Sequence, residues 1–338
     1  MIKKTAVTLA TLLVAVFLSA AFFFHYANQS LNTPFNLAAD TVFIIPKHAP
    51  LRVIAQNLEK QGILKTPTLF LGWIALQGLQ NKIKAGEYAI TASMTPITLI
   101  EAFCAGKVIQ HALSIVPGWT FERLRLALDQ DPSLSHESHG LSNQALMEAL
   151  GHPSVNPEAR FFADTYYFPL GTSDLAFLKR AYDRMDQQLN NLWEKRSLNY
   201  PLASIHEVLI LASIVEKESA FDHEYRDIAG VYLRRLIIKM PLQADPTVLY
   251  GLGPDWKGPL TRAGIARQTP YNTYKNQGLP PTPIAIPSQK ALEATFNPKP
   301  GDALYFVLRP DRQGHVFSKN LEEHVRAVKR YRQTISKG

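Results

Sequence analysis

The first part of the chain is apolar enough to cross a membrane as a helix. Residues 5–24 contain no charged side chain, and about 20 apolar residues in a helix span a bilayer. Lys3 and Lys4 precede this run, which favours a cytoplasmic N-terminus and a body on the outer side of the inner membrane. We therefore predict a cytoplasmic tip and transmembrane anchor over residues 1–26, with a periplasmic body.

A cleaved signal peptide is the alternative for the same segment. Ser19 and Ala21 form a small-x-small pattern that a signal peptidase accepts. The apolar run continues past this pattern through residues 22–24, which favours an uncleaved anchor. Residues 27–40 are polar with one proline, and they are predicted to be a linker.

Beyond residue 40, the spacing of apolar positions predicts short strands that alternate with amphipathic helices. Leu51, Ile54 and Leu58, for example, recur at helical spacing. The pattern of strand, proline, small turn and helix occurs in residues 43–58 and again in 113–128, which predicts two related small α+β units. The predicted strands are 41–46, 85–91 and 110–116, followed by a hairpin at 303–318; the predicted helices are 49–64, 68–80, 96–107, 120–131, 174–191, 204–220, 224–240 and 320–335.

Two segments lack this regular pattern. Residues 131–160 are rich in Pro, Ser, His and Gly and are predicted to be a linker. Its histidines, at 136, 139 and 152, fit no pair on a helix face, so solvated loop histidines are favoured over a metal site. Helical periodicity fades again after Pro241, and dense Gly and Pro through Pro287 predict long ordered loops.

Composition narrows the class of protein. The chain has 338 residues, 46% of them apolar and 19% charged, which is typical of a globular protein of two or three domains. The net charge of +8 favours acidic partners, but no arginine-rich run or basic-aromatic motif accompanies it, so no nucleic-acid partner is expected. Cys104 is the one cysteine, which excludes an internal disulfide and a cysteine zinc site, and its apolar surroundings indicate a small buried residue.

The candidate chemistry begins at the end of an apolar helix. Residues 208–215 are almost wholly apolar, and Glu216 and Glu218 follow directly. The two carboxylates are about 200° apart around a helix, so only one can face a given cleft. A desolvated carboxyl has a raised pKa and can act as a general acid. The helical pattern alone does not decide which of the two is desolvated.

Two later loops, 240–253 and 267–287, carry tyrosines, side-chain amides, glycines and prolines. Tyrosine rings stack on the CH faces of sugars, and amides pair with hydroxyl and N-acetyl groups. Equally, these residues could simply form turns and fill gaps. The substrate-binding candidates are Gln243, Asp245, Thr247, Tyr250, Tyr271, Asn272, Thr273 and Tyr274.

The motifs "LASIVEKES", "LQADPTVLYGLG" and "YNTYKNQGLPPTPIAIP", in this order, resemble the endolytic murein lytic transglycosylases of the YceG-like family. "AGEYAI", "VPGWT", "DTY" and "HVFSKNLEEH" extend the resemblance over essentially the whole chain. Three positions depart from the family pattern: Pro117 stands where a glutamate is usual, Ala163 replaces a proline, and Arg160 occupies a normally small position. These departures concern local loop shape.

The resemblance implies an α+β fold with an N-terminal transmembrane helix, a LysM-like peptidoglycan-binding module at 41–130 and a mixed helical and β catalytic domain at 161–338. It implies cleavage inside nascent glycan strands, leaving 1,6-anhydro-N-acetylmuramic acid ends and so terminating strand elongation. Glu218 takes the position of the family's essential acid, and Glu216 would then be supporting or structural. Peptidoglycan strands, the inner membrane and the peptidoglycan synthases (penicillin-binding proteins) are the implied partners, and no metal, nucleotide or redox cofactor is implied.

Two rival functions stay open from the residues. The anchor and the small α+β units would also suit a non-catalytic peptidoglycan-binding scaffold of the cell-wall synthesis machinery. A hydrolase that pairs Glu218 with Asp245 would need two carboxylates about 5–10 Å apart across a cleft. The scaffold interpretation gains if Glu218 is exposed and far from both loops.

Overall fold

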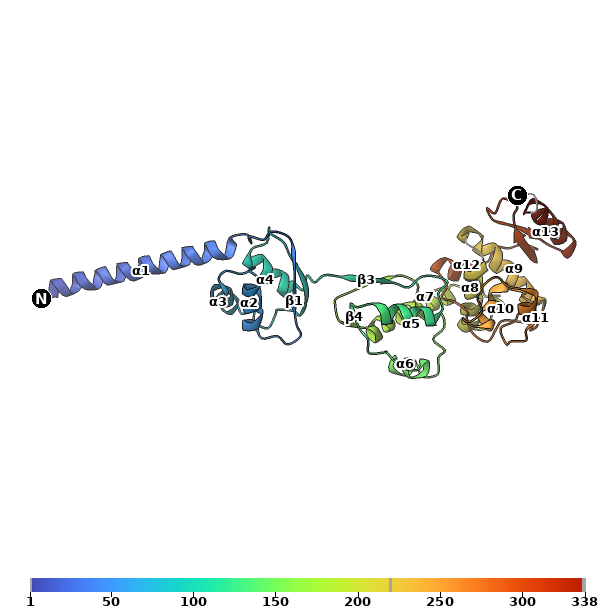
Figure 1. Cartoon of the computed structure of the whole chain (residues 1–338), viewed down its shortest axis with the longest axis horizontal. Coiled ribbons are helices and arrows are strands. Elements are labelled where there is room, and N and C mark those ends of the chain that lie inside the picture. The colour runs from blue at the N-terminus through green and yellow to red at the C-terminus, as the bar shows by residue number, and fades with distance from the viewer. Residues whose placement is uncertain (1, 219–220, 336–338) are drawn as a thin grey trace. The chain divides into compact units, whose positions relative to one another are not determined.

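The computed structural model describes residues 2–218 and 221–335, with side chains from Thr11 onward. The side chains of Lys3 and Lys4, which carry the orientation prediction, and the last two residues of the helix predicted at 204–220 lie outside this described part. The chain forms two compact units: residues 1–111 with 167–170, and residues 112–166 with 171–338 (Figure 1).

The first helix of unit 1 is α1 (Ile2–Asn32), and its described part from Thr11 to Asn32 is long and apolar enough to cross a membrane. The helix continues through the first half of the segment that was predicted as the linker 27–40. Its last turn is not free, because Leu31 is buried and the Ser30 hydroxyl lies 2.9 Å from that of Thr66. The apolar positions of the linker, Leu31 and Phe35, therefore pack on the body of unit 1.

The rest of unit 1 is a small α+β body. Strands β1 (Thr41–Ile45) and β2 (Gly86–Ile90) pair antiparallel, with Phe43 opposite Tyr88. Between them in sequence lie α2 (Leu51–Lys60) and α3 (Pro67–Leu76), and α4 (Pro96–Ala105) follows β2. A Thr95–Thr98 capping box starts α4. These elements enclose one apolar core that includes Phe70, Ile74 and Phe103.

Strands β3 (His111–Ser114) and β5 (Thr165–Phe168) pair with each other. The first unit ends at His111, apart from residues 167–170, whereas the sequence placed the end of the first module at 130. The helix of the second strand–proline–helix repeat, α5 (Phe121–Gln130), belongs to unit 2.

Residues 131–160 are not the linker that their composition predicted. They contain β4 (Leu134–Ser135), which pairs in parallel with β6 (Thr172–Ser173), and a helix, α6 (Asn143–Ala149). Ser142 caps α6 by accepting a hydrogen bond from Ala145, and Leu146 and Met147 are buried. A short helix with two buried positions is hard to separate from a loop by periodicity alone.

The core of unit 2 surrounds α8 (Ile205–Glu218). It packs against α9 (Tyr225–Ile237), α12 (Gln289–Phe296) and α7 (Asp174–Glu194). A short 3₁₀ turn, η1 (Asp222–Glu224), precedes α9. The sequence predicted α7, α8 and α9 correctly. It missed α10 (Asp245–Leu252), α11 (Arg262–Ala266) and α12, because each has at most eight residues among prolines and glycines.

The C-terminal part of unit 2 is the predicted hairpin and helix. Strands β7 (Tyr305–Leu308) and β8 (His315–Ser318) pair antiparallel, and α13 (Leu321–Ile335) packs on them. The Glu224 carboxylate accepts hydrogen bonds from the backbone and the ring of His315, each 2.6 Å long. This contact ties the hairpin to the start of α9.

Candidate active site

Helix α8 delivers two carboxylates at its C-terminal end. Every residue from Val208 to Val215 is buried, so the helix is enclosed on all sides before it reaches Glu216 and Glu218. The helix therefore places Glu216 and Glu218 directly after eight consecutive buried residues.

Glu218 faces α9 and the start of α10. The Tyr232 hydroxyl donates a 2.5 Å hydrogen bond to Glu218 Oε1. Burial raises the pKa of Glu218 to about 7, and the nearby negative charge of Asp245 acts in the same direction. The hydrogen bond from Tyr232 and the positive charge of Arg235 lower the pKa and only partly offset burial. Glu218 is thus a carboxyl that holds its proton close to neutral pH.

Glu216 faces a different element. Its Oε2 accepts a 2.8 Å hydrogen bond from the backbone N–H of Ser288, the N-cap of α12, and its Oε1 accepts a longer one from the Tyr225 hydroxyl at 3.4 Å. The two glutamates therefore have separate surroundings, as their angular separation on the helix predicted. The contacts of Glu216 join α8 to α12, which is a structural role that helical spacing did not reveal.

Two residues of α9 complete the surroundings of Glu218 and were missed by the sequence analysis. Tyr232 is almost fully buried, and Arg235, three residues later on the same face, is 6% exposed. The Arg235 guanidinium donates to the carbonyl oxygens of Leu242 and Leu304, at 2.6 and 2.7 Å. A tyrosine and an arginine spaced i, i+3 within an otherwise apolar helix face were the available signal.

The predicted binding loop 240–253 begins beside this acid. Asp245 is exposed and accepts a 2.6 Å hydrogen bond from the Tyr274 hydroxyl, which brings the two predicted loops together. The charge of Glu218 also acts on Tyr274, whose pKa is raised chiefly by burial. Gln243 is exposed and has a left-handed backbone, with φ of 51°, held by a 3.1 Å bond from its N–H to the Thr273 carbonyl.

Three of the predicted binding residues are placed inside the protein. Thr247, Asn272 and Thr273 are at most 1% exposed. The Thr273 hydroxyl accepts from Ala244 N–H and lies 2.9 Å from the Thr247 hydroxyl, while the Asn272 amide donates to two backbone carbonyls. These side chains fasten the two loops to each other, and this geometry favours a structural role over direct contact with a substrate.

Tyr250, farther along α10, contacts Tyr271 of the second predicted loop. Their rings meet edge to face at 4.9 Å, and the Tyr271 hydroxyl lies 2.9 Å from that of Thr282. The Tyr250 hydroxyl donates a 3.0 Å hydrogen bond to Glu158, a buried carboxyl that the sequence analysis did not single out. Burial raises the pKa of Glu158 to about 7.

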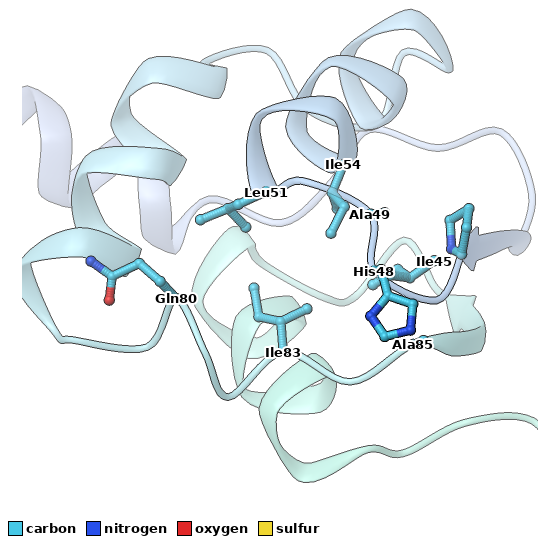
Figure 2. A pocket seen from close by; sticks show the side chains of 9 residues that line it. Ile45, His48, Ala49, Leu51, Ile54, Gln80, Ile83 and Ala85 are labelled. Carbon is cyan, nitrogen blue, oxygen red and sulfur yellow. The ribbon is translucent and has the colours of Figure 1, made fainter.

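Unit 1 has a pocket of its own, of about 220 Å³. It lies between the β1–α2 connection and the segment before β2. Figure 2 shows the polar side chains His48 and Gln80 on opposite sides of the apolar Leu51, Ile54 and Ile83. An apolar floor with polar side chains at its edges suits a small polar ligand with CH faces, such as one sugar ring.

The fold and the site define a protein with a sheltered, proton-holding carboxyl at the end of a buried helix, beside two joined loops rich in tyrosine. The chain belongs to the YceG-like family, whose model matches residues 43–330.

Curated relatives carry a common name. An endolytic murein transglycosylase of Bacillus subtilis (strain 168) is 28% identical over 309 residues, covering 85% of this chain and 83% of that protein. An endolytic murein transglycosylase of Streptococcus pneumoniae (strain R6) is 29% identical over 317 residues, covering 84% of this chain and 57% of its own length. The chain thus spans just over half of the streptococcal relative.

A solved structure has a similar fold. The crystal structure of a yceG-like protein from Listeria monocytogenes superposes with a TM-score of 0.56 at 27% sequence identity. The match covers 86% of this chain and 99% of that one. The similarity therefore extends over nearly all of the neighbour.

Proposed function

We propose that this protein is an endolytic peptidoglycan lytic transglycosylase that cuts nascent glycan strands and leaves 1,6-anhydro-N-acetylmuramic acid ends, which terminates strand elongation. Its family and its transglycosylase relatives make it an enzyme, a lyase, rather than a scaffold alone. The observation that carries the proposal is Glu218, a single carboxyl with a pKa of about 7 beside the polar loop residues Asp245 and Tyr274.

A lytic transglycosylase needs one carboxyl that acts first as acid and then as base. The protonated Glu218 donates its proton to the glycosidic oxygen as the bond from that oxygen to the muramic acid C1 breaks. The resulting carboxylate takes the proton of the C6 hydroxyl as O6 attacks C1, which closes the anhydro ring and restores the acid. No water is consumed, and a pKa near the working pH suits both steps.

The neighbours of Glu218 have positioning roles in this proposal. Tyr232 and Arg235 stabilise the carboxylate formed after the first proton transfer, because one donates a hydrogen bond to it and the other is positively charged. Exposed Gln243 and Asp245 and the partly exposed rings of Tyr271 and Tyr274 are proposed to contact the sugars. Glu216 is proposed to hold α12 in place.

The remaining assignments rest on the same proposal. Helix α1 is proposed to anchor the protein in the inner membrane with its N-terminus inside and its body in the periplasm. The β1–α2–α3–β2 body, with its pocket beside His48, is proposed to be a LysM-like module that holds the glycan. Peptidoglycan synthases are proposed partners, since the substrate is their product.

A hydrolase is the second candidate, because the charge of Asp245 reaches Glu218. In that mechanism Asp245 would activate a water molecule, and the product would have an ordinary reducing end. Mass spectrometry of products from uncrosslinked glycan strands separates the two. We expect anhydro ends from the wild type and at least a 100-fold slower release from Glu218→Gln, in line with the loss of a general acid. Reducing ends alone, or full activity in Glu218→Gln, would overturn the proposal.

A further inference from the structure

Unit 2 contains a second, larger cavity that the catalytic proposal does not use. Its volume is about 1040 Å³, more than one sugar ring fills. It lies between the first turns of α5, the start of α6, the loop before Glu158 and the end of α10. The lining residues that matter here are Glu122, Arg123, Arg125, Asp129, Glu158 and Tyr250.

This cavity is connected to the surroundings of Glu218 by two segments. Helix α10 begins at Asp245, whose charge reaches Glu218, and arrives at Tyr250 five residues later, a rise of about 7.5 Å. Independently, Lys217 Nζ donates to the Gly118 carbonyl at 3.4 Å, and the chain enters the cavity wall two residues later. When a glycan strand is cut at Glu218, the sugars next to the cut are therefore within reach of this cavity.

The lining of the cavity includes a buried carboxyl, Glu158. Glu158 is 6% exposed; its Oε1 accepts from Phe121 N–H and its Oε2 from the Tyr250 hydroxyl, both at 3.0 Å. These two contacts hold the Glu158 carboxyl in place beside Phe121 and Tyr250, which also line the cavity.

Two arginines of the wall are not paired with carboxylates. Arg125 is held by neutral oxygens, the carbonyls of Leu141 and Ser138 at 2.7 and 3.2 Å and the side chain of Asn143 at 3.3 Å. Arg123 lies over the Trp119 ring at 5.5 Å, and within the described part of the chain neither arginine forms a salt bridge. Both guanidinium groups keep donors available for a carboxylate.

Charges of both signs distinguish this cavity from a plain sugar site. Glu122 and Asp129 share the wall with the two arginines. A glycan backbone offers hydroxyl and acetamide groups, which need no arginine. The peptide stems of peptidoglycan carry carboxylates and an amino group, so they match a wall of mixed charge.

We propose that this cavity binds the peptide stem of the glycan strand, with Arg123 and Arg125 recognising its carboxylates. The inference rests on the proposed function, since it assumes that the substrate is peptidoglycan. The inference goes beyond the proposed function because it makes the stem, and not only the sugars, a determinant of which strands the protein binds.

The test measures binding separately from cleavage. Full-length protein carrying Glu218→Gln is titrated by calorimetry with two ligands: uncrosslinked strands that bear stems, and the same strands after an amidase has removed the stems. We expect Arg123→Gln to weaken binding of stem-bearing strands about tenfold and to leave binding of stripped strands unchanged, which corresponds to one lost charge-assisted contact. Arg123 is exposed, so the variant is expected to fold.

Arg196→Gln is the matched control, because Arg196 is also exposed and also lies over a tryptophan, Trp193 at 3.8 Å, outside the cavity. It is expected to bind both ligands like the parent. Equal weakening of both ligands by Arg123→Gln would mean that the cavity holds the glycan itself, and no weakening of either would mean that it binds neither part. Both results overturn the inference. Release of anhydro ends by the otherwise wild-type protein is assayed in parallel, so a failure of the catalytic proposal appears in a different measurement.

Discussion

Glu216 and Glu218 leave the same helix two residues apart and meet different neighbours. Glu216 accepts a backbone hydrogen bond from the cap of α12, whereas Glu218 lies among Tyr232, Arg235 and Asp245. Burial is unfavourable for a charge, and at Glu218 it outweighs the groups that stabilise the carboxylate. The same residue type thus serves structure at one position and is suited to proton transfer at the other.

The hydroxyl of Tyr232 is expected to lower the pH at which activity falls on the alkaline side. Its hydrogen bond stabilises the Glu218 carboxylate, so Tyr232→Phe raises the pKa of Glu218 further. The protonated acid then persists to higher pH, and the alkaline limb of the kcat/KM profile moves up by about one pH unit. Tyr225→Phe is the control on the same helix, because its hydroxyl contacts Glu216 instead. An unmoved limb in Tyr232→Phe would contradict this assignment.

Glu158 is expected to make the stability of the protein depend on pH. Its pKa is about 7 in the folded protein, above the ordinary value of 4.5. Between about pH 4.5 and pH 7, the folded state therefore binds a proton that the unfolded state has released. The stability that this proton gives is complete below about pH 4.5 and is lost as the pH rises through about 7.

Replacing Glu158 by glutamine removes the titration and keeps the shape. Glu158→Gln is therefore expected to exceed the wild type by about 1–3 kcal/mol in free energy of unfolding near pH 8, with the gain vanishing near pH 4. Urea unfolding at both pH values measures this difference. Glu122→Gln, at an exposed neighbouring position, should show no such change, and a pH-independent difference for Glu158→Gln would be evidence against the raised pKa.

At the scale of elements, the side chain of Glu216 joins α8 to α12, a role that helical spacing did not predict. In Glu216→Ala the Ser288 N–H loses its acceptor, so the free energy of unfolding is expected to fall by about 1–2 kcal/mol. The pH profile of activity should keep its alkaline limb, because Glu218 is untouched. Glu293→Ala, exposed on α12, should change stability by less than about 0.5 kcal/mol. A shifted pH profile in Glu216→Ala would instead give this residue a part in the proton transfer.

The start of α10 and the loop that follows α11 depend on the hydroxyl of Thr273. Thr273→Val leaves the buried Ala244 N–H without an acceptor, which is expected to cost about 1–3 kcal/mol of stability. Thr273→Ser keeps the hydroxyl and should lose less than half as much. If Thr273→Val instead raised KM with unchanged thermal unfolding, the residue would be a substrate contact, as the sequence first suggested.

At the scale of the whole molecule, α1 is the element on which the proposed membrane anchoring rests. We expect the full chain to stay in the membrane fraction after an alkaline carbonate wash, and a variant lacking residues 1–26 to be soluble with its body folded. Replacing both Leu13 and Phe17 with arginine should release the full-length chain in the same way. A shortened wild-type chain in the soluble fraction would identify a cleaved signal peptide.

The long helices and the paired strands could be predicted from the local pattern of apolar residues. The amphipathic helices, the strands of unit 1 and the C-terminal hairpin were predicted because their apolar residues repeat with the period of the element that buries them. The motifs around Glu218 also sufficed to name the family, which the match over residues 43–330 confirmed. Short helices such as α6 and α10 escaped, since their few buried positions do not establish a period.

The sequence by itself determined that a carboxylate would stand at the end of a buried helix, and that Glu216 and Glu218 could not share a cleft, because helical geometry is local. Only the tertiary structure decided which neighbours each would meet. Tyr232, Arg235 and Asp245 reach Glu218 from other elements, and Glu158 meets Tyr250 from 92 residues away. A pKa depends on burial and on the charges that lie nearby in the folded protein. The spacing of residues along the chain reveals neither of these.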